Sequence, residues 1–353
     1  MKVLITGGIG FVGCKIIEFL RNNHPSFEII AIDNLSRKGC HLNLSELNRI
    51  DAKFLHCDIR SRSDLESIPK ADWVIDCAAN PSVLAGLNHS SSSLQLMENN
   101  LVGTLNLIEY CKRHNAGLIL LSTSRVYSAA ELSRFSVIEE KTRFSLDASI
   151  ERKGLSQEGI TEEFSTTPPL SLYGASKISS ELLALEYGLN FNFPVWIDRC
   201  GVMAGAGQFG KADQGIISYW IHSFREAKPL SYIGFGGSGL QVRDALHPQD
   251  VAPLLVSQMQ NPDKDAPSII NLGGGLENST SLLELSSWCE NRFGQMEILA
   301  SKENRPMDAP WIVMDSSLAS THWDWKPEIK IDQILSEIAS HAEANPNWLD
   351  LVS

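Results

Sequence analysis

The sequence predicts an α/β protein built on a doubly wound parallel sheet, with a smaller α/β cap in its C-terminal part. Short β-rich runs alternate with helical stretches through the first 200 residues, which implies parallel strands joined by right-handed crossovers. Beyond residue 200, glycine-rich segments separate the helical runs, and no linker, repeat or low-complexity tract divides the two parts. We expect residues 1–200 to form the sheet domain, joined by a strand and a helix from about 240–270, and residues 201–353 to form mainly the cap.

Each expected element follows from its residue pattern. The strands are short runs rich in Val, Ile and Leu that end at Gly, Asp, Asn or Ser: Lys2–Thr6, Glu28–Asp33, Lys53–Cys57, Trp73–Cys77, Gly117–Ser122 and Val195–Arg199. The helices are longer runs with apolar residues three and four apart: Gly13–Asn22, Asn99–Arg113, Ser179–Tyr187, Gly215–Ala227 and Ser281–Arg292.

Composition excludes several classes of function. The chain has 353 residues, 43% of them hydrophobic, enough for a large core, and its 30 basic and 42 acidic residues give a net charge of −12. No run of five basic residues occurs, so we expect no nucleic-acid partner. No stretch of 18 apolar residues occurs, so we expect no membrane span and a cytoplasmic location. The seven cysteines are scattered without a CxxC pair, which favours reduced, buried thiols and no metal site.

A dinucleotide fingerprint opens the chain. The segment Gly7-Gly8-Ile9-Gly10-Phe11-Val12-Gly13 follows a predicted strand and runs into a predicted helix, as in Rossmann-type domains. We expect Gly8 to permit the tight turn, Gly10 to let the backbone approach a pyrophosphate, and Gly13 to let the helix pack on the strand. The helix N-terminus offers unpaired N–H groups to the phosphates. The predicted cofactor contacts in this segment are Gly7, Gly10, Phe11 and Val12.

The end of the second strand predicts which dinucleotide binds. Asp33 lies 20 residues after Gly13, where a carboxylate hydrogen-bonds the adenosine ribose and repels a 2′-phosphate. This favours NAD over NADP, although Arg37 and Lys38 lie close enough to accommodate a phosphate. The expected contacts following Asp33 are Asn34, Ser36 and Arg37.

Other strand ends supply further expected cofactor contacts. Asp58 and Ile59 follow the third strand, where a carboxylate can meet the adenine amino group; the alternative is a surface turn with an ion pair. Ala78 and Ala79 follow the fourth strand and are small enough to admit a cofactor. Asn100 lies near the start of a predicted helix, where an N-cap is the alternative role.

The chain contains one Y-x-x-x-K pattern, formed by Tyr173 and Lys177 at the start of a predicted helix. A spacing of four places the phenol and the ammonium on one helix face. The lysine cation and the positive charge of the nicotinamide both favour the phenolate, which can take a proton from a substrate alcohol while hydride leaves the same carbon. Lys177 can also hold the nicotinamide ribose. A hydroxyl within Leu121–Tyr127, at the end of the fifth strand, can orient the same substrate oxygen. A surface helix pair is the alternative for the Tyr–Lys pattern.

Taken together, these residues resemble the extended short-chain dehydrogenase/reductase family, and specifically its nucleotide-sugar epimerases. The resemblance covers nearly the whole chain. It is closest to the CDP-tyvelose (CDP-paratose) 2-epimerase branch in three segments of the second half: Gln208-Phe209, Asp213-Gln214-Gly215 and Gln241-Val242-Arg243-Asp244. It implies a Rossmann domain, a sugar-nucleotide cap, tightly held NAD, a CDP- or UDP-linked sugar as substrate, and often a homodimer.

The resemblance also implies roles for individual residues. The catalytic hydroxyl is that of Thr123, four residues before Tyr127. Arg243 and Arg305 match positions that bind the nucleotide diphosphate, and an ordinary ion pair is the alternative for each, with Asp244 as the neighbour of Arg243. The expected substrate contacts are Thr123, Gln208, Gln214, Arg243, Arg305 and Asp308.

One segment departs from the family pattern. Ser128 stands where relatives often have glycine, and the stretch from Ser128 to Leu172 is longer than in many of them. It carries the acidic pairs Glu139-Glu140 and Glu162-Glu163. We expect this segment to form a flap near the sugar pocket.

The predicted function is NAD-dependent epimerisation. A sugar hydroxyl is oxidised to a bound ketone, the sugar turns, and hydride returns to the opposite face. The resemblance favours C2 of CDP-paratose or CDP-tyvelose, and a UDP-sugar 4-epimerase is the alternative. A 4,6-dehydratase needs an Asp-Glu pair after the threonine, where this chain has Ser124-Arg125. A ketoreductase would turn over NADPH, which Asp33 disfavours. An NAD-binding regulatory protein on the same fold is the non-enzyme alternative.

Overall fold

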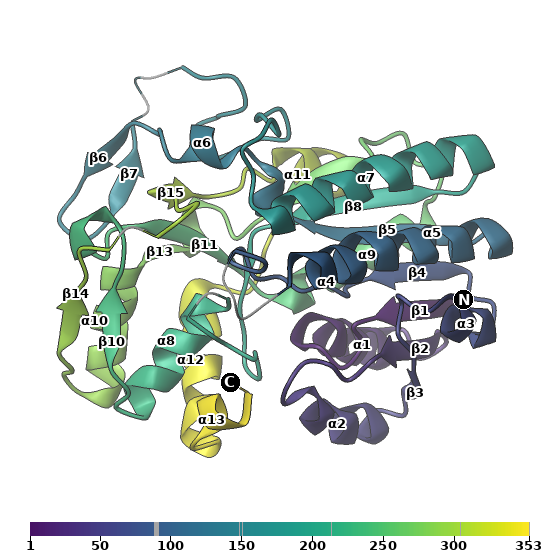
Figure 1. Cartoon of the computed structure of the whole chain (residues 1–353), viewed down its shortest axis with the longest axis horizontal. Helices are drawn as coiled ribbons and strands as arrows, with labels where there is room; N and C mark the ends of the chain where they lie inside the picture. Colours follow the sequence, from purple (N-terminus) through teal and green to yellow (C-terminus); the bar gives the residue numbers. More distant parts are fainter. Residues whose placement is uncertain (88–91, 148, 150, 213, 304, 353) are drawn as a thin grey trace.

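A seven-stranded parallel sheet forms the larger part of the molecule, with strand order β12-β8-β5-β4-β1-β2-β3 (Figure 1). The computed structural model describes residues 1–353 except 88–91, 148, 150, 213, 304 and 353. The strands of this sheet are β1 (Lys2–Thr6), β2 (Glu28–Asp33), β3 (Lys53–His56), β4 (Trp73–Asp76), β5 (Gly117–Thr123), β8 (Val195–Cys200) and β12 (Ile269–Leu272). The strand order reverses direction beside β1, between β1 and β4, which is where such sheets bind ligands.

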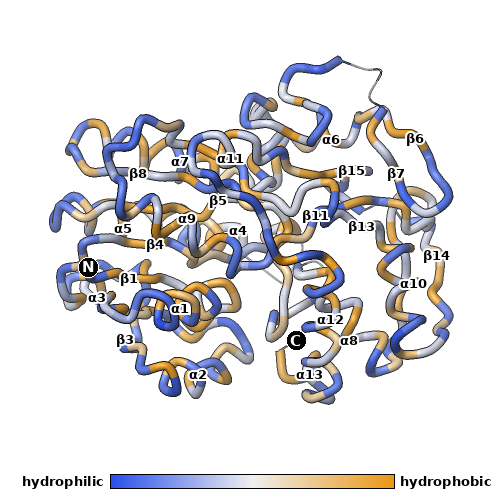
Figure 2. The backbone as a smooth tube through the Cα atoms, turned by 180° about the vertical axis from the view of Figure 1, so that it is seen from behind, coloured by the Kyte–Doolittle hydropathy of each residue, from blue (hydrophilic) through white to orange (hydrophobic). Residues whose placement is uncertain are grey.

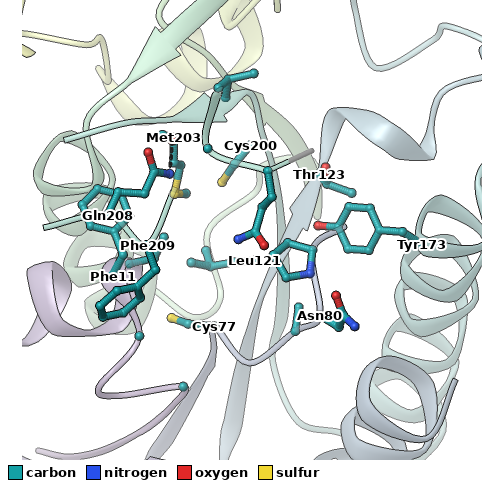
Figure 3. Close-up of a pocket in the computed structure, with 18 of the residues that line it drawn as sticks. Phe11, Cys77, Asn80, Leu121, Thr123, Tyr173, Cys200, Met203, Gln208 and Phe209 are labelled. Carbon is teal, nitrogen blue, oxygen red and sulfur yellow. Dashed lines mark hydrogen bonds between the residues drawn. The ribbon is translucent and has the colours of Figure 1, made fainter. Parts of the chain in front are cut away.

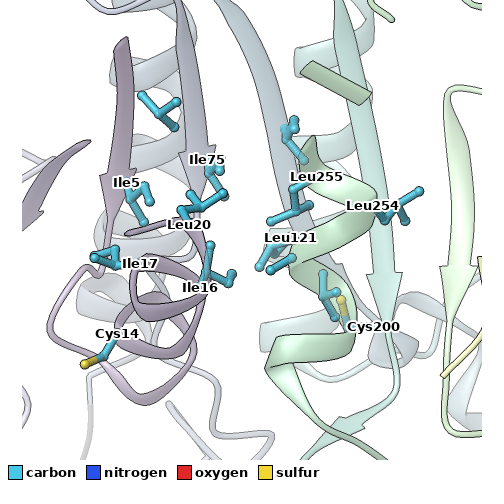
Figure 4. Packing of buried hydrophobic residues seen from close by; sticks show 14 of the residues in the cluster. Ile5, Cys14, Ile16, Ile17, Leu20, Ile75, Leu121, Cys200, Leu254 and Leu255 are labelled. Atoms are coloured by element: carbon cyan, nitrogen blue, oxygen red, sulfur yellow. The ribbon is translucent and has the colours of Figure 1, made fainter. Parts of the chain in front are cut away.

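Helices cover both faces of this sheet because its strands are apolar on both faces. On one face, Ile5 and Leu121 belong to a cluster with Ile17 of α1 and Leu255 of α9 (Figure 4). On the other face, Leu4 packs in a separate cluster with side chains of α3, α5 and α7. Figure 2 shows that hydrophobic residues predominate along the central strands and hydrophilic residues in many peripheral loops. The helices of this layer are α1 (Phe11–Asn23), α2 (Leu44–Arg49), α3 (Arg62–Ser67), α4 (Ser93–Met97), α5 (Gly103–His114), α7 (Leu172–Phe191), α9 (Pro248–Gln260) and α11 (Ser317–Trp323).

The predicted doubly wound fold is confirmed, and the six predicted strands match β1, β2, β3, β4, β5 and β8 to within one residue at their ends. The predicted helix Asn99–Arg113 is in fact divided: a π-helical turn, η2 (Glu98–Val102), leads into α5. The chain returns to the large sheet late, through α9 and then β12, whose parallel partner is β8.

A smaller set of strands and helices faces the carboxyl ends of the large sheet (Figure 1). Its central strand, β11 (Val242–Leu246), pairs with β13 (Ser279–Ser281), β15 (Trp311–Ile312) and β9 (Val202–Met203). A separate parallel pair joins β10 (Leu230–Tyr232) and β14 (Ile298–Ala300). The helices here are α8 (Ile216–Arg225), α10 (Leu282–Phe293), α12 (Ile331–Ala344) and α13 (Trp348–Val352). Trp220 of α8 and Ile338 of α12 belong to the buried cluster of this part.

The described residues of the segment 128–172 lie beside the main cavity without lining it: Ala129, Leu132 and Ser171 border a small pocket together with Val83 and Arg125 of the cavity wall, so the expected flap near the sugar pocket stays a prediction. It contains α6 (Ala129–Leu132) and the antiparallel strands β6 (Val137–Glu139) and β7 (Phe144–Leu146). Arg143 binds Glu284 of α10 with a 2.6 Å ion pair, and the Phe144 N–H donates to the Leu240 carbonyl. The segment also contacts the large sheet, since the Asn271 N–H of β12 donates to Glu162 at 2.6 Å, and its described residues do not line the main cavity. Within the described residues, no helix is long and apolar enough to cross a bilayer.

Candidate active site

A cavity of about 680 Å³ lies where the carboxyl ends of the large sheet meet the smaller part (Figure 3). Residues at the carboxyl ends of β1, β2, β3, β4, β5 and β8 contribute to its wall, together with loops of the second half. Of the predicted site residues, all but one line it: Gly7, Gly10, Phe11, Val12, Asp33, Asn34, Ser36, Arg37, Asp58, Ile59, Ala78, Ala79, Thr123, Tyr173, Lys177, Gln208, Gln214, Arg243, Arg305 and Asp308.

The glycine turn after β1 brings α1 against the strand. Gly7, not Gly8 as the sequence suggested, has the left-handed backbone (φ +59°) that makes the turn. A Cβ on Gly8 would lie 2.7 Å from Cβ of Ala31, and one on Gly13 would lie 2.3 Å from the Gly7 carbonyl oxygen. Both glycines are therefore required by close packing.

This turn fits a pyrophosphate. Gly10 precedes α1 without any side-chain hydrogen bond to the first N–H groups of the helix, and Gly10, Phe11 and Val12 line the cavity. Unpaired N–H groups at a helix start bind anions well. Because the backbone itself forms this wall, the residues present match the requirements of a dinucleotide.

The cavity wall after β2 and β3 contains two acids in different environments. Burial raises the pKa of Asp33, although its Oδ1 accepts a 2.8 Å hydrogen bond from the Leu35 N–H. The Arg60 guanidinium, 2.6 Å away, holds the pKa of Asp58 down at about 2. Asp58 also accepts from the Asn34 amide at 3.2 Å. The ion pair considered as the alternative for Asp58 is thus present, although the residue still lines the cavity.

Asn100 is the predicted cofactor residue that lies outside the cavity wall. Its Oδ1 accepts from the Asn80 N–H at 2.8 Å, and its Nδ2 donates to the Asn80 carbonyl and to Ser176 Oγ. Its N-cap role is also absent, because it sits within the π-helical turn η2. Asn100 therefore supports the loop after β4 and the catalytic helix from behind, and Asn80 takes the place in the wall.

Tyr173, Thr123 and Lys177 converge on one side of the cavity. Tyr173 projects from the first turn of α7 towards Thr123 at the end of β5 (Figure 3). Lys177, one turn further along α7, is 2% exposed and donates from Nζ to the Leu121 carbonyl at 3.0 Å. Ser171 caps α7 by accepting from the Gly174 N–H, which fixes where the helix begins. The arrangement suits proton transfer to and from a hydroxyl held between Tyr173 and Thr123.

Another part of the cavity wall is cationic. Arg243 donates to Asp308 at 2.7 Å and to the Ala309 carbonyl at 2.9 Å. Asp244, the expected alternative partner of Arg243, points to the other face of β11, where it accepts from the Met314 N–H. Strand alternation places neighbouring side chains on opposite faces. Arg305 also lines the cavity and is close enough to Arg243 for their positive charges to repel each other.

Gln208 and Gln214 lie in a loop that bridges the two halves of the cavity. Gln208 donates to the Met203 carbonyl at 2.8 Å, and Gln214 accepts from Arg37 at 2.9 Å. Arg37 also donates to the Phe209 carbonyl. An expected cofactor residue and an expected substrate residue thus bind each other. Asp213, which belongs to the same motif, lies outside the described residues.

Sequence reasoning missed several wall residues, of which Arg125 matters most. It follows Thr123 by two residues and lines the cavity together with Tyr173, Arg243 and Arg305. In the sequence, Arg125 stands out only as one of the two residues that occupy the place of the Asp-Glu pair of the 4,6-dehydratases. The signal available was a cation directly after a strand end that already carried the catalytic hydroxyl. The other unpredicted wall residues include Asn80, Pro81, Val83, Met203, Phe209 and Thr280.

Comparisons with known proteins agree with this geometry. A sequence model described as the NAD dependent epimerase/dehydratase family matches residues 3–273. The chain is 30% identical to CDP-paratose 2-epimerase of Salmonella typhi over 334 residues, covering 93% of this chain and 95% of that protein. It is 26% identical to UDP-glucuronate 4-epimerase of Thermodesulfobacterium geofontis, covering 97% and 96%. The crystal structure of UDP-glucuronic acid 4-epimerase from Bacillus cereus, solved with UDP-glucuronic acid and NAD, superposes with a TM-score of 0.76 at 24% identity over 98% of this chain and 99% of that one.

Proposed function

This chain belongs to the NAD dependent epimerase/dehydratase family, and from that premise we propose that it epimerises C2 of CDP-paratose or CDP-tyvelose. The observation that carries the proposal is the Tyr173–Thr123–Lys177 arrangement on a cavity wall that contains no acid pair after Thr123. The CDP-paratose 2-epimerase of Salmonella typhi, 30% identical over nearly its full length, supports the choice of sugar and carbon.

The cofactor side would hold NAD with the backbone and with few side chains. Gly10, Phe11 and Val12 would face the pyrophosphate, and Asp33 would accept hydrogen bonds from the adenosine ribose. Lys177 would hold the nicotinamide ribose with the donors that its bond to Leu121 leaves over. When bound, NAD supplies reversible acceptance of hydride at a sugar carbinol carbon.

Residues of the protein would transfer the proton of the reacting hydroxyl. Thr123 hydrogen-bonds the reacting sugar oxygen and orients it, and Tyr173 accepts the hydroxyl proton as the carbon is oxidised. Lys177 keeps a positive charge one helical turn from the phenol, which stabilises the phenolate. After the keto sugar turns over in the cavity, Tyr173 returns the proton to the oxygen. The same residue thus acts first as base and then as acid.

The wall after Thr123 argues against dehydration. Eliminating water from C5 and C6 requires a further acid and base beside the sugar, and relatives in this family include dTDP-glucose 4,6-dehydratase of Salmonella typhimurium at 25% identity. Here Ser124 and Arg125 occupy that place. A guanidinium does not exchange protons at neutral pH, so the second proton transfer lacks a carrier.

A UDP-sugar 4-epimerase is the second candidate, favoured by the 26% identity to UDP-glucuronate 4-epimerase over 97% of this chain. One experiment decides between the two. The purified protein, without added coenzyme, is incubated with CDP-paratose, CDP-tyvelose, UDP-glucose and UDP-glucuronate, and the products are resolved by NMR. We expect inversion at C2 of the CDP-sugars alone. Inversion at C4 of a UDP-sugar would establish the second candidate, and no conversion of any sugar would favour an NAD-binding regulatory protein.

We also propose that the protein is a homodimer, as the family resemblance implies. The outer side of α7 exposes large apolar side chains: Leu182 is 61% exposed and Leu189 is 81% exposed. These residues are seven apart and therefore share a helix face. Replacing both with Glu should convert the dimer to a monomer in sedimentation velocity. A wild-type protein that is already monomeric at micromolar concentration would contradict this assignment.

A further inference from the structure

We propose that Arg125 binds the sugar-side phosphate of the nucleotide sugar and thereby holds the carbon next to the anomeric carbon at Tyr173. The inference rests on the proposed function and extends it, because it assigns a contact to a residue that carries no role there. It is carried by three features: the fixed position of Arg125, the absence of a protein acceptor for its guanidinium, and the charge balance of the wall around it.

The backbone of Arg125 is locked between the two catalytic residues. Its N–H donates to Thr123 Oγ1 at 3.2 Å. Its carbonyl lies against the start of α7, since a Cβ on Gly174 would come within 2.1 Å of that oxygen. Arg125 is therefore held beside Tyr173 by main-chain contacts on both sides. Its side chain therefore leaves the backbone next to Gly174, the residue that follows Tyr173.

The guanidinium of Arg125 makes no hydrogen bond or ion pair with any residue that the structure describes. Its charge interacts at longer range with Arg243, Asp308 and Arg305, and with Tyr173. Burial lowers its pKa to about 10, so the group stays charged at neutral pH. A partly buried cation with five N–H donors needs an anionic acceptor, and one supplied by the substrate meets that need.

The charges around Arg125 match a diphosphate. Arg125 interacts electrostatically with two other guanidinium groups, those of Arg243 and Arg305, and with one carboxylate, that of Asp308. Asp308 is already bound to Arg243 at 2.7 Å. These four groups carry a net charge of +2, which balances the two negative charges of a sugar-linked diphosphate. Arg125 is the member of this group nearest in sequence to Thr123, so it would take the phosphate nearer the sugar.

Contact with that phosphate constrains which carbon reacts. The phosphate is attached to C1 of the sugar, and C2 is bonded directly to C1, whereas C4 lies across the ring. A cation that holds the sugar-side phosphate next to Tyr173 and Thr123 therefore presents the C2 hydroxyl to them. The same chemistry, anionic oxygen, could come from a sugar carboxylate instead. The phosphate is favoured because Arg125 interacts electrostatically with Arg243 and Arg305, the two arginines that the family resemblance assigns to the diphosphate.

Calorimetry with sugar-free nucleotides tests the contact independently of turnover. Arg125→Met is compared with wild type for CMP and CDP, and for UMP and UDP, with NAD content and thermal melting recorded for each protein. Loss of a hydrogen-bonded charge should lower the affinity for CDP and UDP roughly 10–100-fold and change the affinity for CMP and UMP by no more than about twofold. Arg125→Lys should recover part of the loss. Arg134→Met, which removes an exposed arginine outside the cavity wall, should change neither.

The outcomes separate the possible acceptors. Equal affinity of wild type and Arg125→Met for CDP and UDP would overturn the proposal. If Arg125→Met no longer binds UDP-glucuronate but still binds UDP with wild-type affinity, Arg125 binds a sugar carboxylate and the phosphate assignment is wrong. Selective loss of the diphosphates supports the contact even if the sugar panel reveals a different substrate. Inversion at C4 in that panel would leave the contact standing and overturn only the choice of carbon.

Discussion

The two sides of the cavity are built in different ways. The side that we assign to the cofactor comes from the turns after β1, β2 and β4, and much of it is backbone held close by glycine. The substrate side gathers side chains from Arg125, Gln208, Arg243 and Arg305, which are separated by up to 180 residues. Recognition by backbone depends on local spacing, whereas recognition by charge depends on which distant side chains meet. The difference means that the sugar pocket can change without disturbing the dinucleotide turn.

Gly13→Ala should break the cofactor side most completely. The new Cβ would lie 2.3 Å from the Gly7 carbonyl, so α1 must move off β1. We expect the protein to purify without NAD, to show no measurable conversion, and to lose about 1–3 kcal/mol of unfolding free energy. NAD content and urea unfolding measure this. Gly236→Ala, at a positive-φ glycine with open space around it, should keep its NAD. Full NAD occupancy in Gly13→Ala would disprove the packing argument.

Tyr173→Phe should abolish chemistry without affecting either binding side. Removing the proton acceptor should lower kcat by roughly 10²–10⁴-fold, while NAD and nucleotide affinity stay unchanged. Turnover by NMR and nucleotide affinity by calorimetry give the two readouts. A variant that keeps full activity would show that another group carries the proton.

Arg243→Ala should damage the substrate side alone. It removes a cation from the diphosphate site and leaves Asp308 unpaired, so KM for the nucleotide sugar should rise roughly 10–100-fold with NAD content unchanged. Arg143→Ala is the matched control, because Arg143 forms a 2.6 Å ion pair with Glu284 outside the cavity wall. An unchanged KM in Arg243→Ala would return this residue to a structural role.

Buried groups in the two parts of the fold should make stability respond to pH in opposite directions. Burial raises the pKa of Asp198 on β8 to about 7, so the native sheet retains a proton that the unfolded chain releases. This contribution is complete at low pH and is lost as pH rises from about 4 to 7. Asp198→Asn, which can still bond Gln258, should therefore gain stability over wild type as pH rises, reaching on the order of 2–4 kcal/mol above pH 7. A pH-independent difference in unfolding free energy would refute the assignment.

In the smaller part, burial lowers the pKa of His222 to about 3 and that of His341 to about 4. Both must stay neutral in the native state, so their contribution is present above pH 6.5 and is lost as pH falls below it. His341→Gln should flatten this acid-side loss in thermal melts between pH 4 and 6.5. The effect should be the smallest of this series, because the pKa of His341 is displaced less far from its ordinary value than that of Asp198.

The sequence alone determined the parts of this protein that depend on local spacing. The alternating pattern located β1, β2 and β8 to within a residue, since apolar runs bounded by turn residues define strands on a doubly covered sheet. The glycine fingerprint and the Tyr173–Lys177 spacing depend on single turns, so the pattern was sufficient there. The pattern predicted that Gly8 makes the turn, whereas Gly7 does, because a sequence of adjacent glycines does not indicate which of them adopts a positive φ.

The tertiary structure decided what long-range packing controls. Only the fold shows that Asn100 supports Asn80 from outside the wall, that the segment 128–172 contacts both the smaller part and the large sheet, and that Arg243 pairs with Asp308. The convergence of Arg125 with two arginines more than 100 residues away is likewise invisible in the sequence. Charge balance is a property of positions in space, and side chains from separate loops acquire it only when the sheet and the smaller part come together.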